Sequence, residues 1–187
     1  MTIFHDKIFT RRLLLRRLRR EDLSLLVDWS QSKKCYGEFL TPDKMTIEQV
    51  TEQFAANYFW NEKNRFFLIE AREHAAIGTI HYWLRPEKND IAVMAVKIAL
   101  PDKRLMGYGT EAQKYLIIHL FDTVRISSVE MYTDIDNFAQ QRCLQKLGFE
   151  IVKSLTYEDQ HVVRTGHLYR LSCKQYHAAP LYKYHYE

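Results

Sequence analysis

Residues 91–112 restrict the fold more than any other stretch, because a strand-like run passes through a glycine-containing turn into a helical pattern. Residues 91–100 are almost entirely apolar and rich in β-branched side chains, which is typical of a strand buried in a sheet. Pro101 ends this strand, since proline has no amide hydrogen for a sheet ladder. Gly107 and Gly109 then allow a tight turn, with a positive φ expected at Gly109, and leave backbone N–H groups exposed where the helix begins. Such a helix start suits a phosphate.

The length and charge of the chain indicate one globular domain. A chain of 187 residues can bury one good core and is short for two. The net charge of +4 permits an anionic ligand but does not require nucleic acid. We therefore predict a single domain over residues 1–187 with an aromatic tail at about 174–187, and no nucleic-acid partner. This tail suits packing across the domain or a dimer contact, and the spacing of its histidines, His177 and His185, does not support a metal site.

The cysteines and the hydropathy pattern favour a cytoplasmic protein. Cys35, Cys143 and Cys173 lie far apart and form no C-x-x-C pair, so neither a disulfide framework nor a zinc site is predicted. A reducing cytosol is the simplest compartment for such a chain. No apolar stretch approaches membrane-spanning length, and the first residues lack the apolar region of a signal peptide. We expect no metal and no membrane partner.

The arginine-rich segment at residues 11–20 has two interpretations. A basic tract of this kind fits binding to RNA or to an anionic membrane. It also fits a strand that places Leu13 and Leu15 on one face and leaves its arginines in solvent. The acidic residues that follow at once favour the strand.

Strands and helices are predicted on both sides of the central strand. A helix is expected near residues 23–29, and a second one begins at the capping box formed by Thr46 and Gln49. His119, on the helix behind the glycines, is expected to be a packed histidine rather than a ligand. The other expected elements are strands at 66–70 and 76–84, a strand at 127–133, a helix capped by Asn137 and ended by Gly148, and strands at 149–155 and 162–171.

The glycines also match the dinucleotide-binding pattern, as Gly107-x-Gly109-x-x-Ala112, and acidic residues follow the next strand. An NAD(P)-dependent oxidoreductase is therefore an alternative. Against it, residues 101–106 separate the strand from the first glycine, half of the chain precedes the motif, and little chain follows it. No G-K-S/T sequence follows the glycines, so ATP or GTP chemistry is disfavoured.

Three segments together resemble the GNAT family of N-acetyltransferases, in its ribosomal-protein-alanine acetyltransferase-like branch. Residues 12–29, with Arg12, Asp22 and Trp29, resemble the opening strand and helix of that branch. Residues 104–112 resemble the acyl-CoA pyrophosphate loop, Q/R-x-x-G-x-G/A. Residues 137–149 resemble the second cofactor element. Each segment alone is a weak signal, but their order and spacing are specific.

The resemblance implies an α/β domain whose mixed, largely antiparallel sheet is flanked by helices and splayed between the central strand and the strand at 127–133. Acetyl-CoA, as co-substrate, would lie in that opening. The residues implied to bind it are Arg104, Met106, Gly107, Tyr108, Gly109 and Thr110 at the pyrophosphate, and Ile98, Ala99 and Asn137 along the pantetheine arm.

Two residues depart from the family pattern. Met94 stands where many members carry a glutamate on the central strand, and Leu144 stands where many carry a tyrosine that can protonate the leaving thiolate. Because the neighbouring positions on the strand are also apolar, a catalytic base has to come from elsewhere. His81 and Asp134 are the best titratable candidates.

The sequence thus predicts an N-acetyltransferase that moves an acetyl group from acetyl-CoA to an amine of a small molecule or of a protein N-terminus. The alternatives are the oxidoreductase above and a non-catalytic acyl-CoA-binding module, which the two departures leave open. The acceptor cannot be read from the sequence.

Overall fold

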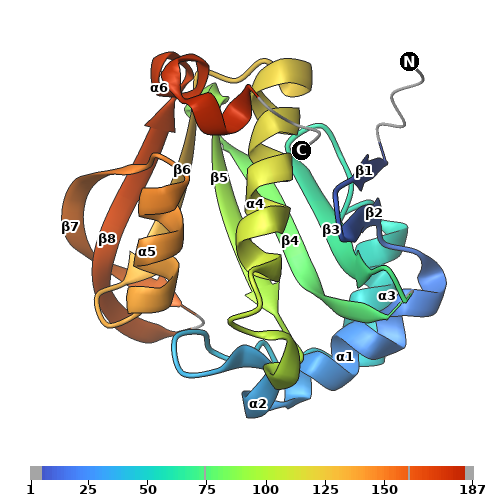
Figure 1. Ribbon diagram of the computed structural model, residues 1–187. Helices are drawn as coiled ribbons and strands as arrows, with labels where there is room; N and C mark the ends of the chain where they lie inside the picture. Colours follow the sequence, from blue (N-terminus) through green and yellow to red (C-terminus); the bar gives the residue numbers. More distant parts are fainter. Residues whose placement is uncertain (1–5, 74, 160, 184–187) are drawn as a thin grey trace.

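The computed structural model describes residues 6–73, 75–159 and 161–183, and these build one eight-stranded sheet (Figure 1). The strands are ordered β1-β2-β3-β4-β5-β6-β8-β7, and among the described strands only β5 and β6 pair in parallel. The sheet is therefore mixed and largely antiparallel, as predicted. The strands are β1 (Lys7–Phe9), β2 (Leu13–Arg17), β3 (Asn64–Ala71), β4 (Ala76–Arg85), β5 (Lys88–Ile98), β6 (Ser128–Asp134), β7 (Glu150–Asp159) and β8 (Val162–Ser172).

Helices cover both faces of this sheet. Helix α4 (Tyr108–His119) runs across the sheet in front of β5, and α5 (Phe138–Lys146) lies on the same side near β8 (Figure 1). Helices α1 (Leu23–Gln31) and α3 (Ile47–Ala55) pack on the other face, over β3. The shorter helices are α2 (Lys33–Tyr36), α6 (Cys173–Ala178), a π-helical turn at Leu120–Val124 that continues α4, and 3-10 turns at Arg20–Asp22, Pro101–Lys103 and Pro180–Tyr182.

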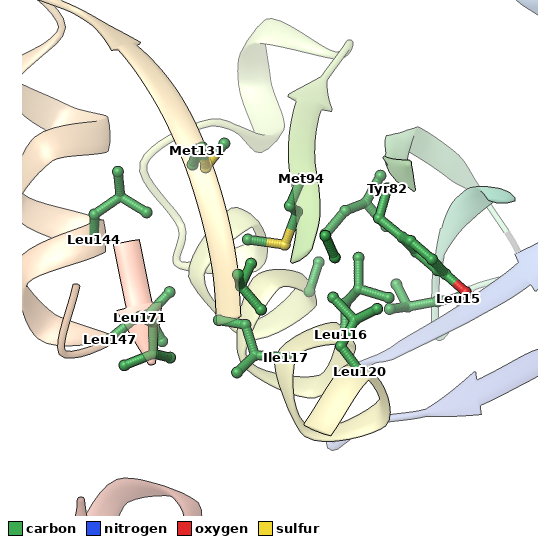
Figure 2. Close-up of a cluster of buried hydrophobic side chains, with 14 of the residues drawn as sticks. Leu15, Tyr82, Met94, Leu116, Ile117, Leu120, Met131, Leu144, Leu147 and Leu171 are labelled. Atoms are coloured by element: carbon green, nitrogen blue, oxygen red, sulfur yellow. The ribbon is translucent and has the colours of Figure 1, made fainter. Parts of the chain in front are cut away.

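The larger apolar core lies between the sheet and helices α4 and α5. Figure 2 shows Met94 of β5 within this core, among Tyr82 of β4, Leu116 of α4 and Leu120 of the π-helical turn. A second, smaller cluster joins α1 and α3 to the opposite face of β3 and includes Trp29. No helix in the described part of the chain is both long and apolar enough to cross a membrane.

The local helix signals predicted from the sequence are confirmed. Thr46 caps α3 by accepting a hydrogen bond from the Gln49 amide, and the Gln49 side chain completes the capping box. Asn137 caps α5 by accepting from the Gln140 amide at 3.1 Å. Gly148 follows α5 with a φ of 81°, the left-handed conformation that ends many helices. His119 is buried at 8% exposure beside Phe67, as expected of a packed histidine.

The arginine-rich segment forms a strand, with Leu13 and Leu15 buried, but one of its arginines is not in solvent. Arg16 is only 6% exposed, and its guanidinium lies 2.7 Å from both Asp22 and Glu70. Burial alone would raise the pKa of Asp22, but the hydrogen bonds from Arg16 and from the Arg19 amide outweigh it and lower that pKa. The prediction of solvated arginines is therefore wrong at Arg16, because its two carboxylate partners come from different segments.

The described part of the aromatic tail packs across the domain. Tyr176 stacks on Phe121 at 4.5 Å, and the Tyr182 hydroxyl donates to the Leu147 carbonyl at 2.7 Å. Both tyrosines are buried. His185 lies outside the described residues.

The sheet is continuous from β1 to β5 but opens between β5 and β6. These strands pair only at Ile91–Ser128, Ala92–Val129 and Val93–Glu130, and they diverge beyond those pairs. After Val93, toward the C-terminal end of β5, the edge of β5 that faces β6 has no strand partner among the described residues. A doubly wound dinucleotide-binding sheet needs a series of parallel strands, so this topology contradicts the oxidoreductase alternative.

Gly78 marks the tightest backbone approach at the β4–β5 pairing. A β-carbon at this position would lie 2.0 Å from the Lys97 carbonyl oxygen. We predict that Gly78→Ala lowers the free energy of unfolding by about 1–3 kcal/mol, because two paired strands have to move apart. Urea unfolding monitored by circular dichroism measures this loss.

Gly109→Ala is the matched control for this substitution. Its β-carbon would meet nothing nearer than Ile98, at 3.7 Å, and its φ is not positive. Its stability should change by less than about 1 kcal/mol. Equal losses in the two variants would contradict the steric argument.

Candidate active site

The divergence of β5 and β6 opens a cavity of about 440 Å³. Met94 and Val96 line it from β5, Thr133 and Asp134 from β6, and Asn137 from the start of α5. The cavity follows from the short β5–β6 pairing, because no other strand of the described residues fills the space between the separated strand ends. This is the opening that the sequence predicted between the central strand and the strand at 127–133.

The N-terminus of α4 lies next to the end of β5, across the turn at 99–107. Gly107 precedes the helix with a φ of 80°, and no described side chain caps the first turn. The first N–H groups of a helix have no acceptors within the helix and attract anions. The positive φ expected at Gly109 is found at Gly107 instead, because Gly109 already lies inside the helix.

A partly exposed ion pair between Arg12 and Glu111 braces this helix start. Glu111 accepts hydrogen bonds from the Thr10 hydroxyl at 2.6 Å, the Arg12 amide at 2.7 Å and Arg12 Nε at 2.6 Å. Burial raises the pKa of Glu111, but these bonds outweigh it and lower that pKa. Arg12 Nη1 also donates to the Met106 carbonyl at 3.0 Å, and its guanidinium lies 4.5 Å from the centre of the Tyr108 ring. The segment between β1 and β2 thus holds the glycine turn in place.

Arg104, predicted to bind the cofactor, directs its side chain to backbone carbonyls. It donates to Ile98 at 2.9 Å and to Lys34 and Cys35 at 2.6 and 2.9 Å, with a longer contact to Ala99 at 3.4 Å. In this arrangement Arg104 ties the glycine turn to the end of β5 and to helix α2.

The backbones of Ile98 and Ala99 face opposite edges of β5. The Ala99 amide donates to the Ile77 carbonyl at the start of β4, at 2.8 Å. Since N–H groups alternate along a strand, the Ile98 amide points to the edge that β6 leaves open. Ile98 is therefore better placed than Ala99 to pair with a ligand lying along that edge.

A second cavity, of about 580 Å³, lies on the face of β4 and β5 that α1 and α3 cover at one end. Its lining includes Tyr36, Phe66, His81 and Lys97. It shares Trp83, Ala95 and Val96 with the first cavity. The two cavities therefore adjoin at the point where β5 leaves β6.

His81 lines this second cavity as part of an aromatic stack. Its ring lies 4.0 Å from Phe66 at an interplanar angle of 4° and 5.4 Å from Trp83 at 25°. Burial, helped by the charge of Lys97, lowers the pKa of His81 to about 3. The imidazole is thus neutral at pH 7 and a weak base.

Asp134 lines the first cavity with its carboxylate already engaged. One oxygen accepts the Asp136 amide at 3.0 Å and the other lies 3.5 Å from Arg164. The two predicted base candidates therefore occupy different cavities, and Asp134 is the last residue of β6 and has an ion-pair partner.

Lys97 is a titratable residue that the sequence reasoning missed. Burial lowers the pKa of Lys97 to about 8, and its Nζ lies 3.7 Å from the centre of the Tyr36 ring. The available signal was a lone lysine within the apolar run at 91–100. Met94 and Leu144 are buried at 1% and 0% exposure, so the two departures from the family pattern belong to the core. No cluster of metal-binding side chains occurs in the described part of the chain.

The pKa of His81 predicts how stability depends on pH. An unfolded histidine takes up a proton near pH 6.5, whereas folded His81 does so only near pH 3, so the fold loses stability as the pH falls below 6.5. His81→Phe removes this titration and keeps a ring in the stack. Between pH 7 and pH 5 the variant should lose about 1 kcal/mol less than the parent in urea unfolding, a value reduced from the full linkage because the ring is partly exposed. Equal losses would show that His81 titrates normally.

Comparison with known proteins agrees with this fold. Residues 12–150 match the family model described as the acetyltransferase (GNAT) domain. A search of curated proteins gives no significant match. Among solved structures, a GNAT-family acetyltransferase from Bacillus anthracis superposes with a TM-score of 0.73 at 16% identity, over 89% of this chain and 98% of that one.

Two further similar structures have amine acceptors in their names. A spermidine N-acetyltransferase chimera from Vibrio cholerae and hSSAT gives a TM-score of 0.77 at 14% identity, covering 90% of this chain and 99% of that one. An aminoglycoside acetyltransferase in complex with coenzyme A and kanamycin gives 0.74 at 18% identity, covering 89% and 98%. At these identities the likeness shows the fold, and the family model, which spans most of the chain, shows that the protein belongs to the GNAT acetyltransferase family.

Proposed function

We propose that this protein is an acetyl-CoA-dependent N-acetyltransferase whose acceptor is an amine of low pKa. The observation that carries the proposal is the opening between β5 and β6, which holds the first cavity and adjoins the second, with an uncapped helix N-terminus beyond the end of β5. A long anionic co-substrate and a separate acceptor need this arrangement. The reactive groups of the two molecules have to meet at one place, and each molecule has to enter from a different side of the sheet.

The residues around the opening fit acetyl-CoA, which supplies an acetyl group activated as a thioester. The N–H groups from Met106 to Thr110 would bind its pyrophosphate. The open edge of Ile98 and the side chain of Asn137 would contact its pantetheine arm. Arg104 would act indirectly, by holding the turn that presents these N–H groups. The 580 Å³ cavity would then hold the acceptor.

The low pKa of the acceptor follows from the scarcity of strong bases. A lysine-like amine, pKa about 10.4, is neutral in roughly one part in a few thousand at pH 7, which costs about 4.6 kcal/mol. An α-amino group, pKa about 8, costs roughly 1.4 kcal/mol by the same arithmetic. Met94 is buried in the core and His81 is a weak base, so neither residue can assist deprotonation of the acceptor strongly. The site therefore suits an amine whose deprotonation needs the smaller free energy.

A peptide N-terminus is an acceptor of this kind. It agrees with the ribosomal-protein-alanine acetyltransferase-like branch that the segment from Arg12 to Trp29 resembles. The alternative, a non-catalytic acyl-CoA-binding module, is favoured by the apolar residues Met94 and Leu144. Turnover of any amine distinguishes the two functions.

The proposed pyrophosphate site predicts the effect of Gly109→Val. A branched side chain in the first turn of α4 would project into the space at the exposed N–H groups. Calorimetry should show at least a hundredfold weaker binding of acetyl-CoA, while circular dichroism stays unchanged. Gly109→Ala, which adds one methyl group, should lose much less. Parental affinity in Gly109→Val, or binding of NADH but not of CoA by the parent, would contradict the proposed site.

The proposed acceptor chemistry predicts the pH dependence. The value of kcat/KM should rise with pH along the ionisation curve of the acceptor, and its midpoint should move when acceptors of different pKa are compared. His81→Phe and Asp134→Asn should each lose less than about tenfold, below the factor that a positioned general base contributes. A midpoint fixed near pH 8 for every acceptor would instead indicate a protein group such as Lys97. A thousandfold loss in either variant, with acetyl-CoA still bound, would identify that residue as the base.

A further inference from the structure

The wall of the second cavity is an aromatic surface. Phe66, His81 and Trp83 stack side by side on β3 and β4, and Phe59 meets Phe66 edge-on at 5.2 Å. Tyr58 continues the row at 5.3 Å from Phe59. All five side chains line the cavity, and we call them the aromatic wall.

This wall is only partly covered by the protein itself. Phe66, His81 and Trp83 are half-buried, whereas the opposite face of the same strands, with Phe67 and Tyr82, is fully buried against the core. Because His81 is neutral at pH 7, the stack carries no charge there. Flat aromatic rings prefer to stack on, or to meet edge-on, another ring. The exposed side of the wall therefore suits a planar ligand group.

The charged side chains that line the cavity are Asp43, Asp159 and Lys97. Asp159 accepts from Arg164 Nε at 2.9 Å and from the Thr41 amide at 2.8 Å. Asp43, at the exposed rim, accepts from the Tyr36 hydroxyl, and the Lys97 ammonium lies over the Tyr36 ring. A ligand with several positive charges would meet the Lys97 ammonium and would find only one lining carboxylate, Asp43, without a salt bridge among the described residues. The cavity therefore disfavours polycations.

The wall ends where the reaction has to take place. Trp83 lines both cavities, as do Ala95 and Val96 of β5. A ring resting against Phe66 and His81 would thus place an amine one or two carbons away near the junction with the first cavity. The volume of about 580 Å³ accommodates an aromatic amino-acid derivative with room for the start of a peptide.

We propose that the acceptor carries an aromatic side chain next to its α-amino group, and that this ring is bound by the aromatic wall. The proposal rests on the proposed acetyltransferase function and specifies its acceptor. The shared chemistry, an α-amine beside an aromatic ring, is found in free amino-acid derivatives and in peptides that begin with Phe, Tyr or Trp.

Amides of single amino acids test the proposal, because they all present the same α-amino group and differ only in the side chain. Phenylalanine amide should exceed alanine amide in kcat/KM by roughly 30- to 100-fold, as expected for burying a ring. It should exceed cyclohexylalanine amide, which has similar bulk without a flat ring, by about two- to tenfold, the factor of one aromatic pair. Spermidine should be a poorer acceptor than phenylalanine amide. A phenylalanine-initiated hexapeptide distinguishes the two sources: its preference over the amide indicates a protein N-terminus.

Substitutions in the aromatic wall test whether its residues cause the preference for phenylalanine amide over cyclohexylalanine amide. Trp83→Leu should reduce the ratio between phenylalanine and cyclohexylalanine amides to about one, and Trp83→Phe should retain it. Phe9→Leu, which changes an exposed ring on β1 outside the cavity, should leave the ratio unchanged. Phe66→Leu provides a second wall variant if Trp83→Leu does not fold. Because each ratio is taken within one variant, a general loss of activity does not affect it.

Calorimetry of the same amides with the protein separates the two proposals. If no amine is acetylated, the proposed function fails, and tighter binding of phenylalanine amide than of cyclohexylalanine amide would still support the wall. A ratio below twofold in the parent, a ratio unchanged in Trp83→Leu or Phe66→Leu, or spermidine as the best acceptor would overturn the proposal.

Discussion

Strands β5 and β6 share three residue pairs and then separate, and both cavities depend on this separation. A parallel pair that continued to the end of β5 would bring Ile98 beside β6 and fill the opening. Antiparallel pairing holds β5 firmly to β4 along its other edge. The sheet can therefore open at one position without losing its core, since α4 and α5 pack over the opening from one side.

The glycine turn at the end of β5 depends on contacts that are distant in sequence. Arg12 and Glu111 connect the segment just before β2 to the start of α4, and Arg104 connects the turn to α2. Helix α2 also supplies Tyr36, which faces Lys97 in the second cavity. The proposed cofactor and acceptor sites thus share one rigid support, so a change at Arg104 affects both.

The pKa values of buried polar side chains in this protein depend on which groups surround them. Arg16 is buried yet stable as a cation, because Asp22 and Glu70 both contact it. His81 and Lys97 are covered by rings instead of carboxylates, and burial lowers the pKa of each. The same face of the sheet therefore combines a neutral imidazole with a lysine whose pKa is about 8, and both line the second cavity.

The sequence by itself determined the elements whose signals are local: the apolar strand ended by Pro101, the helix that follows the glycines, the Thr46 capping box, the Asn137 cap and the Gly148 stop. These features depend on a few neighbouring residues and on backbone preferences that hold in any fold. The tertiary structure alone decided that Arg16 is buried, that Arg104 binds carbonyls, that Gly107 rather than Gly109 has the positive φ, and that His81 and Lys97 have lowered pKa values. These properties depend on which distant segments come into contact and how much water they exclude, and no short stretch of the sequence contains that information.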